Sequence, residues 1–263
     1  MNRFTVNTLI LVFFLGCNLS ALAAWQEGEF SGELNWEGNV TQVANPWNWA
    51  QPGLPDVPPL DLRQGESTEG QTVWRGLLTR AVVLRGVTET LMPSGRTGVA
   101  PRINFGDTEQ NIHIDWLKEG IARVTLPVTG PGGMADLKGS LVFSMRSGAV
   151  IIATNNTQRQ GYSVVAGPED SRNGLPPAGK AADYKQVLSL LQDSLSYATF
   201  PWLSSSVANG GEASFSLMNQ RQYTAVGSAY AAEIIGGSGE ISFPSGAVPS
   251  RWQVSLPVQV TYQ

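Results

Sequence analysis

The feature that most constrains this 263-residue chain is a strict alternation of apolar and polar residues near each of its ends. From Phe30 to Thr41 the even-numbered residues are apolar or glycine, and the odd-numbered residues are polar. Side chains of a β-strand point alternately to opposite faces, so this pattern predicts a long strand with one apolar face. That face consists of Phe30, Gly32, Leu34, Trp36, Gly38 and Val40.

The last residues of the sequence repeat the pattern. The apolar positions are Trp252, Val254, Leu256, Val258, Val260 and Tyr262. Pro257 falls on the outward face and has no N–H, which indicates a strand with one side unpaired in the ladder. Both alternating segments are therefore predicted to be strands that can lie at the edge of a sheet.

The first 24 residues are predicted to be a secretory signal peptide, which does not belong to the fold. Arg3 supplies a positive charge, residues 9–15 are apolar, and small residues precede Trp25. The apolar run is shorter than the roughly 18 residues that a membrane-spanning helix needs. One alternative stays open at Cys17, which follows a Leu-Gly pair as in the lipidation site of bacterial lipoproteins.

Composition narrows the fold class and the function class. The 29 glycines and 16 prolines indicate a β-rich chain with many turns. A net charge of −4 argues against nucleic acid as a partner. If cleavage falls before Trp25, the only cysteine, Cys17, leaves with the signal peptide, and no disulfide can then form. About 240 residues remain, enough for one large β domain, which we prefer to two small ones.

The interior of the sequence predicts many short strands and one helix. The strands are expected near residues 72–77, 82–87, 102–105, 112–116, 122–127, 139–144, 149–153, 213–218, 225–231 and 239–243. Such strands, separated by turn residues, are typical of a β-sandwich. Asp183 can cap a helix whose apolar stripe is Tyr184, Val187, Leu188, Leu191 and Leu195. Residues 45–59 contain five prolines and are predicted to be an extended loop.

Patterns for enzymatic chemistry are weak in this sequence. Residues 174–181 resemble a phosphate-binding loop, but Ala181 replaces the magnesium-binding hydroxyl and two prolines remove N–H donors. His113 is the only histidine, so a catalytic triad or a histidine-rich metal site lacks partners, and we expect an exposed strand residue. No metal and no cofactor is predicted.

Two further function classes remain to be weighed. Paired carboxylates among Asp115, Glu119 and the Glu169-Asp170 pair leave a secreted glycosidase as an alternative. The eight tryptophans raise the possibility of sugar binding through exposed rings. Trp36 and Trp252 are expected in the core, whereas the better candidates for exposure are Trp47, Trp49 and Trp202.

The two alternating segments together resemble those of subunits of chaperone–usher fimbriae, specifically the family of the K-eighty-eight (F-four) fimbriae. The likeness rests on residues 28–41, on the Trp47-Asn-Trp49 sequence, and on the C-terminal strand with its penultimate Tyr262. Interior patches that also look similar are residues 98–105, 126–128, 139–141, 187–200 and 229–231. The likeness covers most of the mature chain in patches.

The resemblance implies an all-β fold, an incomplete immunoglobulin-like sandwich with inserted strands and one short helix. Residues 25–41 would be an N-terminal donor-strand extension, and residues 42–263 would be the subunit domain. A periplasmic chaperone would first cover the open edge, and at the outer-membrane usher the extension of another fimbrial subunit would replace it. The protein would reach the cell surface as part of an extracellular fimbria.

The same resemblance assigns roles to the two apolar faces. The face from Phe30 to Val40 would be donated to a neighbouring subunit, and its four large side chains would contribute roughly 6–12 kcal/mol on burial. The face from Trp252 to Tyr262 would belong to the strand that binds chaperone and usher during assembly. We expect a structural, minor subunit and no enzyme. An adhesin that binds a host glycan, and a self-contained sandwich with ordinary terminal strands, remain the alternatives.

Overall fold

The computed structural model describes residues 45–52, 62, 65–106, 111–130, 138–156, 158–167, 173–195, 200–204 and 207–263. All of them belong to one unit, Ala44–Gln263. The predicted signal peptide and the predicted donor face from Phe30 to Val40 lie outside the described residues.

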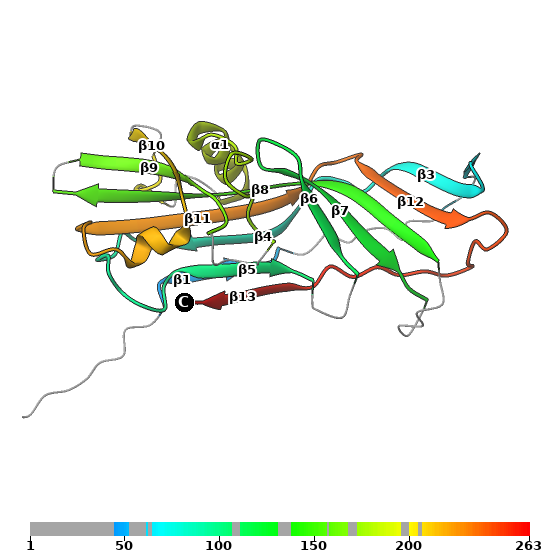
Figure 1. Cartoon of the computed structure of the whole chain (residues 1–263), viewed down its shortest axis with the longest axis horizontal. Helices are drawn as coiled ribbons and strands as arrows, with labels where there is room; N and C mark the ends of the chain where they lie inside the picture. Colours follow the sequence, from blue (N-terminus) through cyan, green and yellow to red (C-terminus); the bar gives the residue numbers. More distant parts are fainter. Residues whose placement is uncertain are drawn as a thin grey trace, which may run out of the picture. The chain divides into compact units, whose positions relative to one another are not determined.

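The described chain is mainly β-structure, arranged as one large and one small sheet (Figure 1). The large sheet has eleven strands: β1 (Trp47–Ala50), β2 (Glu66–Thr68), β3 (Gln71–Leu77), β4 (Ala81–Thr88), β6 (His113–Trp116), β7 (Ile121–Val128), β8 (Gly139–Asn155), β9 (Gln158–Val164), β10 (Ala208–Ala213), β11 (Ala225–Ile234) and β12 (Gly239–Pro244). The small sheet pairs β5 (Pro101–Phe105) with β13 (Val258–Tyr262). The predicted all-β class is confirmed.

The large sheet is organised around the 17-residue strand β8. Strands β7 and β12 pair with its first half, β9 pairs with its second half, and β11 runs along it from Met145 to Thr154. Strand β4 follows β11, and β1 follows β4 at the edge. All these pairs are antiparallel, whereas β9 and β10 are parallel.

Alternate residues of β8 face two separate apolar clusters. Ile151 belongs to the main core cluster, which also contains Ile103 of the small sheet. Val150 and Ile152 belong to a second cluster beneath the helix. The second half of β8 is therefore covered on both faces, which explains why residues 147–153 are all buried.

The helix predicted from its apolar stripe is present as α1 (Tyr184–Leu195), and it lies over β8 and β11 (Figure 1). The side chain of Asp183 accepts a hydrogen bond from the N–H of Gln186 at 2.9 Å. The side chain of Gln186 accepts one from the N–H of Asp183 at 3.1 Å. This reciprocal pair satisfies N–H groups that the first turn of a helix leaves unbonded.

Several predicted elements differ from the structure. The two strands expected at residues 139–144 and 149–153 are the single strand β8, because Gly148 forms no turn. A Cβ atom at Gly148 would lie 2.9 Å from a methyl carbon of Val187, so glycine there allows α1 to approach the sheet closely.

The strand expected at residues 213–218 is wrong. Strand β10 ends at Ala213, and a 3-10 helix, Phe215–Asn219, follows it. Phe215 and Met218 are both buried, and a spacing of three residues places them on the same side of such a helix. Strands β1, β2, β9 and β10 were not predicted.

The expected exposure of two tryptophans is wrong. Trp47 is 6% exposed and Trp202 is 8% exposed, because both occupy core clusters. The segment expected as an extended loop begins with β1, which contains Trp47 and Trp49.

Candidate subunit-assembly site

The C-terminal strand β13 lies antiparallel to β5, with Val258 opposite Phe105 and Tyr262 opposite Pro101. Among the described strands, β5 is the only one that pairs with β13. The ladder is shorter than the strand predicted from Trp252 onward. Before β13, an isolated bridge joins Gln253 to Thr129 through two hydrogen bonds of 2.9 Å.

Within the described residues, the backbone of β13 has one bonded edge and one open edge. The carbonyl of Pro257 accepts a hydrogen bond from the N–H of Gly106 at 2.7 Å, and the N–H of Gln263 donates to the carbonyl of Ala100 at 3.1 Å. Odd-numbered residues thus direct their backbone groups toward the β5 side. In an antiparallel ladder the next residues direct theirs to the opposite side. The N–H and C=O groups of Val258, Val260 and Tyr262 therefore point to what we call the open edge.

The missing N–H of Pro257 lies on the bonded side of the segment, next to Gly106. The expectation that β13 has one unpaired side agrees with the pairing of the described strands. Pro257, however, does not create that unpaired side. It instead leaves the pair with Gly106 one hydrogen bond short, just before β13 begins.

The predicted alternation of faces is present along the C-terminal segment. Five of its apolar side chains are partly buried and pack against the main core cluster: Trp252, Val254, Leu256, Val258 and Val260. Tyr262 is 37% exposed. The intervening Gln253, Ser255 and Gln259 are exposed. The open edge thus carries half-buried apolar side chains beside unpaired backbone groups.

Aromatic side chains join β1 to the C-terminal end of β13. The indole N–H of Trp49 donates to the hydroxyl of Tyr262 at 2.7 Å. Trp49 stacks on Trp47 with ring centres 4.8 Å apart, and the indole N–H of Trp47 donates to the carbonyl of Val99 at 2.8 Å. Burial raises the pKa of the Tyr262 hydroxyl, and the hydrogen bond from Trp49 partly opposes this shift. Sequence reasoning did not link Trp49 with Tyr262, because no spacing rule relates residues so far apart.

The loop that resembles a phosphate-binding motif uses its polar groups internally. The N–H of Gly179 donates to the carboxylate of Glu212 at 3.0 Å. The Lys180 ammonium donates to the carbonyl of Trp116 at 2.5 Å. A carboxylate at the position where a phosphate would bind repels anions, which supports the interpretation of this segment as a turn before α1.

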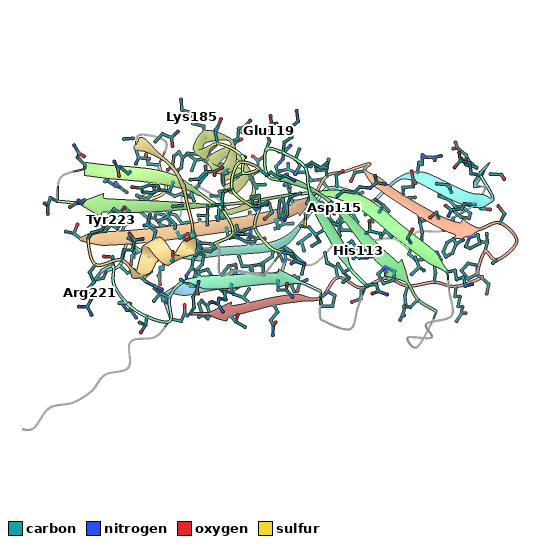
Figure 2. All side chains as sticks on the ribbon, viewed as in Figure 1. His113, Asp115, Glu119, Lys185, Arg221 and Tyr223 are labelled. Carbon is teal, nitrogen blue, oxygen red and sulfur yellow. The ribbon has the colours of Figure 1, made fainter. Side chains whose placement is uncertain are left out.

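Three of the remaining candidates for chemistry lie on or near β6. Figure 2 shows His113 and Asp115 on this strand and Glu119 in the turn that follows it. His113 is exposed, as predicted. Glu169 and Asp170 lie outside the described residues. Among the described residues, no group of three or more potential metal ligands occurs. In the same part of the chain, no helix has both the length and the apolar character needed to cross a membrane.

Comparisons with known proteins agree with the geometry. A family model described as "Fimbrial, major and minor subunit" matches residues 6–263. The chain is 34% identical to the K88 minor fimbrial subunit FaeI of Escherichia coli over 264 residues. The match covers 97% of this chain and 98% of that protein.

Proposed function

The chain belongs to the K88 family of major and minor fimbrial subunits, and on that premise we propose that β13 is the strand through which it is assembled. Membership in this family makes the chain a structural subunit of an extracellular fimbria, exported to the cell surface. The minor-subunit relative fits a minor role in the fibre. Family membership also implies a chaperone, an usher and other fimbrial subunits as partners.

The open edge of β13 is the observation that carries the proposal. Unpaired N–H and C=O groups along a strand form a template for another strand, and proteins normally cover such an edge. Here the open edge lies beside the half-buried side chains of Val258 and Val260. Addition of a strand supplies hydrogen bonds to the backbone and apolar contacts to these side chains at once.

We assign two successive occupants to this edge. A periplasmic chaperone covers it first, and the segment from Phe30 to Val40 of another subunit replaces the chaperone. The strict alternation of that segment supports the assignment, since one face would contact the core and the other would face solvent. In this scheme the segment from Trp252 to Tyr262 is the assembly strand, and the protein is not an enzyme.

Substitutions in the donor segment test this proposal. We expect Leu34→Asp and Trp36→Asp to leave a chain that forms a one-to-one complex with the chaperone but is not incorporated into fimbriae. Asn35→Asp, on the polar face between them, is the matched control and should assemble normally. Fimbriae containing the Leu34→Asp chain at the normal yield would contradict the proposal.

Binding of a host glycan is a second candidate function. A hollow of about 260 Å³ beside β1 and α1 is lined by residues that include Asn48, Arg85 and Phe200. An aromatic ring beside amide and guanidinium groups can contact a sugar through both an apolar face and hydrogen bonds. A glycan array probed with assembled fimbriae tests it. Arg85→Ala should weaken binding, while Arg75→Ala on β3 should not, and an array without any binding would exclude this function.

A further inference from the structure

Arg102 is the only charged residue on the two strands of the small sheet, β5 and β13. It lies opposite Thr261, whereas the next pair along these strands, Ile103 with Val260, faces the main core cluster. Because successive side chains of a strand point to opposite faces, Arg102 and Thr261 lie on the outer face of this sheet. The strand residues of that face thus carry one positive charge and no carboxylate side chain.

The side chain of Arg102 is directed toward the C-terminal end of β13. Its Nη2 donates to the side-chain oxygen of Gln263, the residue that follows β13, at 2.6 Å. Its Nε–H is buried without a hydrogen-bond partner among the described residues. The guanidinium therefore lies toward the strand that bears the open edge, and it keeps a donor that the contact with Gln263 does not use.

A strand added at the open edge would bring its own outward side chains close to this guanidinium. Neighbouring strands lie about 4.8 Å apart, so β5 and the added strand would be separated by about 10 Å, with β13 between them. Arginine and glutamate side chains that lean toward each other over β13 are together long enough to span that gap. A carboxylate on the outer face of the added strand can therefore reach Arg102.

The polar face of the donor segment carries the matching charge. Two of its residues are carboxylates and none is a cation; they are Ser31, Glu33, Asn35, Glu37, Asn39 and Thr41. When the apolar face contacts the core, this polar face lies on the outer side of the small sheet, the side of Arg102.

We infer that Arg102 forms a charge contact with the acidic face of the inserted strand, and that the open edge therefore prefers acidic strands to basic ones. This inference rests on the proposed function of the open edge. Charges across an interface act mainly on the choice of partner, because a like charge in the same place is repelled. The guanidinium suits this role, since it is always charged and donates readily to carboxylates.

The size of the preference follows from the exposure of the outer face. An exposed ion pair changes an equilibrium by a factor of about 1.5–5, and a like-charge pair acts by a similar factor in the opposite sense. Replacement of glutamate by lysine combines the two effects. The open edge should then discriminate between an acidic and a basic strand by about threefold to tenfold at low salt.

Peptide competition tests the inference. The acceptor is the full-length chain carrying Leu34→Asp and Trp36→Asp, so that its own donor segment does not compete. It is refolded at low salt with an equimolar mixture of two synthetic peptides that cover residues 28–42, one wild-type and one with both Glu33→Lys and Glu37→Lys. Mass spectrometry of the purified complex gives the ratio of the incorporated peptides. Both peptides compete for the same acceptor, so this ratio does not depend on the stability of an acceptor variant.

We expect the acceptor with Arg102 to favour the wild-type peptide about threefold to tenfold. With Arg102→Glu the preference should reverse toward the lysine peptide, and with Arg102→Gln it should be largely lost. Arg75→Glu, on β3 of the large sheet, changes the net charge as much as Arg102→Glu does and is the matched control. It should keep the original preference. Sodium chloride at about 0.5 M should weaken the preference, because salt screens exposed charges.

Two kinds of result overturn the inference. A ratio that is the same with and without Arg102, or that changes as much with Arg75→Glu, shows that Arg102 does not select the strand, although the open edge still accepts one. If no acceptor incorporates either peptide, the open edge does not accept the donor segment, and the proposed function fails together with the inference. If Arg102→Glu does not refold, Arg102→Gln decides alone, since an unchanged preference in that acceptor contradicts the inference.

Discussion

A reciprocal exchange of nearly isosteric side chains on β13 tests which face of the strand is apolar. Val260→Thr replaces a methyl group by a hydroxyl on the face that packs against the main core cluster. Thr261→Val makes the reverse exchange at the next residue, whose side chain points to the other face. The two changes alter volume very little, so they report on polarity.

The expected loss of stability for Val260→Thr follows from how deeply residue 260 is buried. A hydroxyl buried without a hydrogen bond costs about 1–3 kcal/mol in protein mutants. Val260 is only partly buried, so the lower end, about 1 kcal/mol, applies. For a chain of this size that loss lowers the melting temperature by about 2–4 °C. Thr261 is also partly buried, but valine there brings no unpaired polar group into the protein, so Thr261→Val should stay within about 0.5 kcal/mol of the parent.

Thermal unfolding of the two full-length variants, purified in the same assembly state and compared at equal protein concentration, provides the measurement. Equal concentration matters because association shifts the apparent stability. A gain of stability for Thr261→Val together with no loss for Val260→Thr would mean that β13 turns its other face to the core. The proposed contact between Val260 and an inserted strand would then be refuted.

Three more predictions concern the body of the subunit. Leu191→Ala in α1 should lower the free energy of unfolding by about 2–5 kcal/mol in urea titrations, whereas Gln192→Ala on the exposed side should change it by less than about 0.5 kcal/mol. Burial, and then a hydrogen bond with Tyr223, raise the pKa of Tyr162 to about 12, so ultraviolet titration should detect its phenolate only near that pH. An unfolded chain loses this proton near pH 10, so stability should fall as the pH rises from about 10 to about 12, and a normal titration would contradict the burial. Arg80 forms an ion pair with Glu233, so Arg80→Ala should lower the free energy of unfolding by about 1–2 kcal/mol, less than for a fully buried pair because the guanidinium is half exposed. The double variant with Glu233→Gln should recover most of that loss, because it removes the charge of a carboxylate that is 5% exposed.

The sequence predicted those parts of the fold that depend on a regular local period. The helix was correct from its cap to its stripe, because Asp183 and the apolar spacing both act within a few residues. Strand β8 was misread because Gly148 has a role that only tertiary structure reveals, namely the close approach of Val187. The 3-10 helix at Phe215–Asn219 was predicted as a strand, because Phe215 and Leu217 are two residues apart. That spacing is typical of a strand, but over so few residues it also occurs in a 3-10 turn.

Part of the candidate site could be predicted from the sequence, because its strand also has a regular local period. Alternation revealed which side chains of the C-terminal segment face the core, from Trp252 to Val260. The length of the ladder between β13 and β5 could not be predicted from the sequence, because it depends on where β5 ends. The contact between Trp49 and Tyr262 joins residues 213 positions apart, so it depends on the arrangement of both sheets.

Under the proposed function, the small sheet would couple the folding of this chain to its assembly. The large sheet holds eleven strands and has apolar clusters on both faces, so it has the packing that independent stability requires. The small sheet has two strands, and a two-stranded unit is marginal in water without a further strand. It nevertheless closes the main core through Ile103 and Phe105 of β5. If subunits join by strand addition along β13, as proposed, the added strand gives this layer a third strand, and the bonds that join subunits also finish the core of each one.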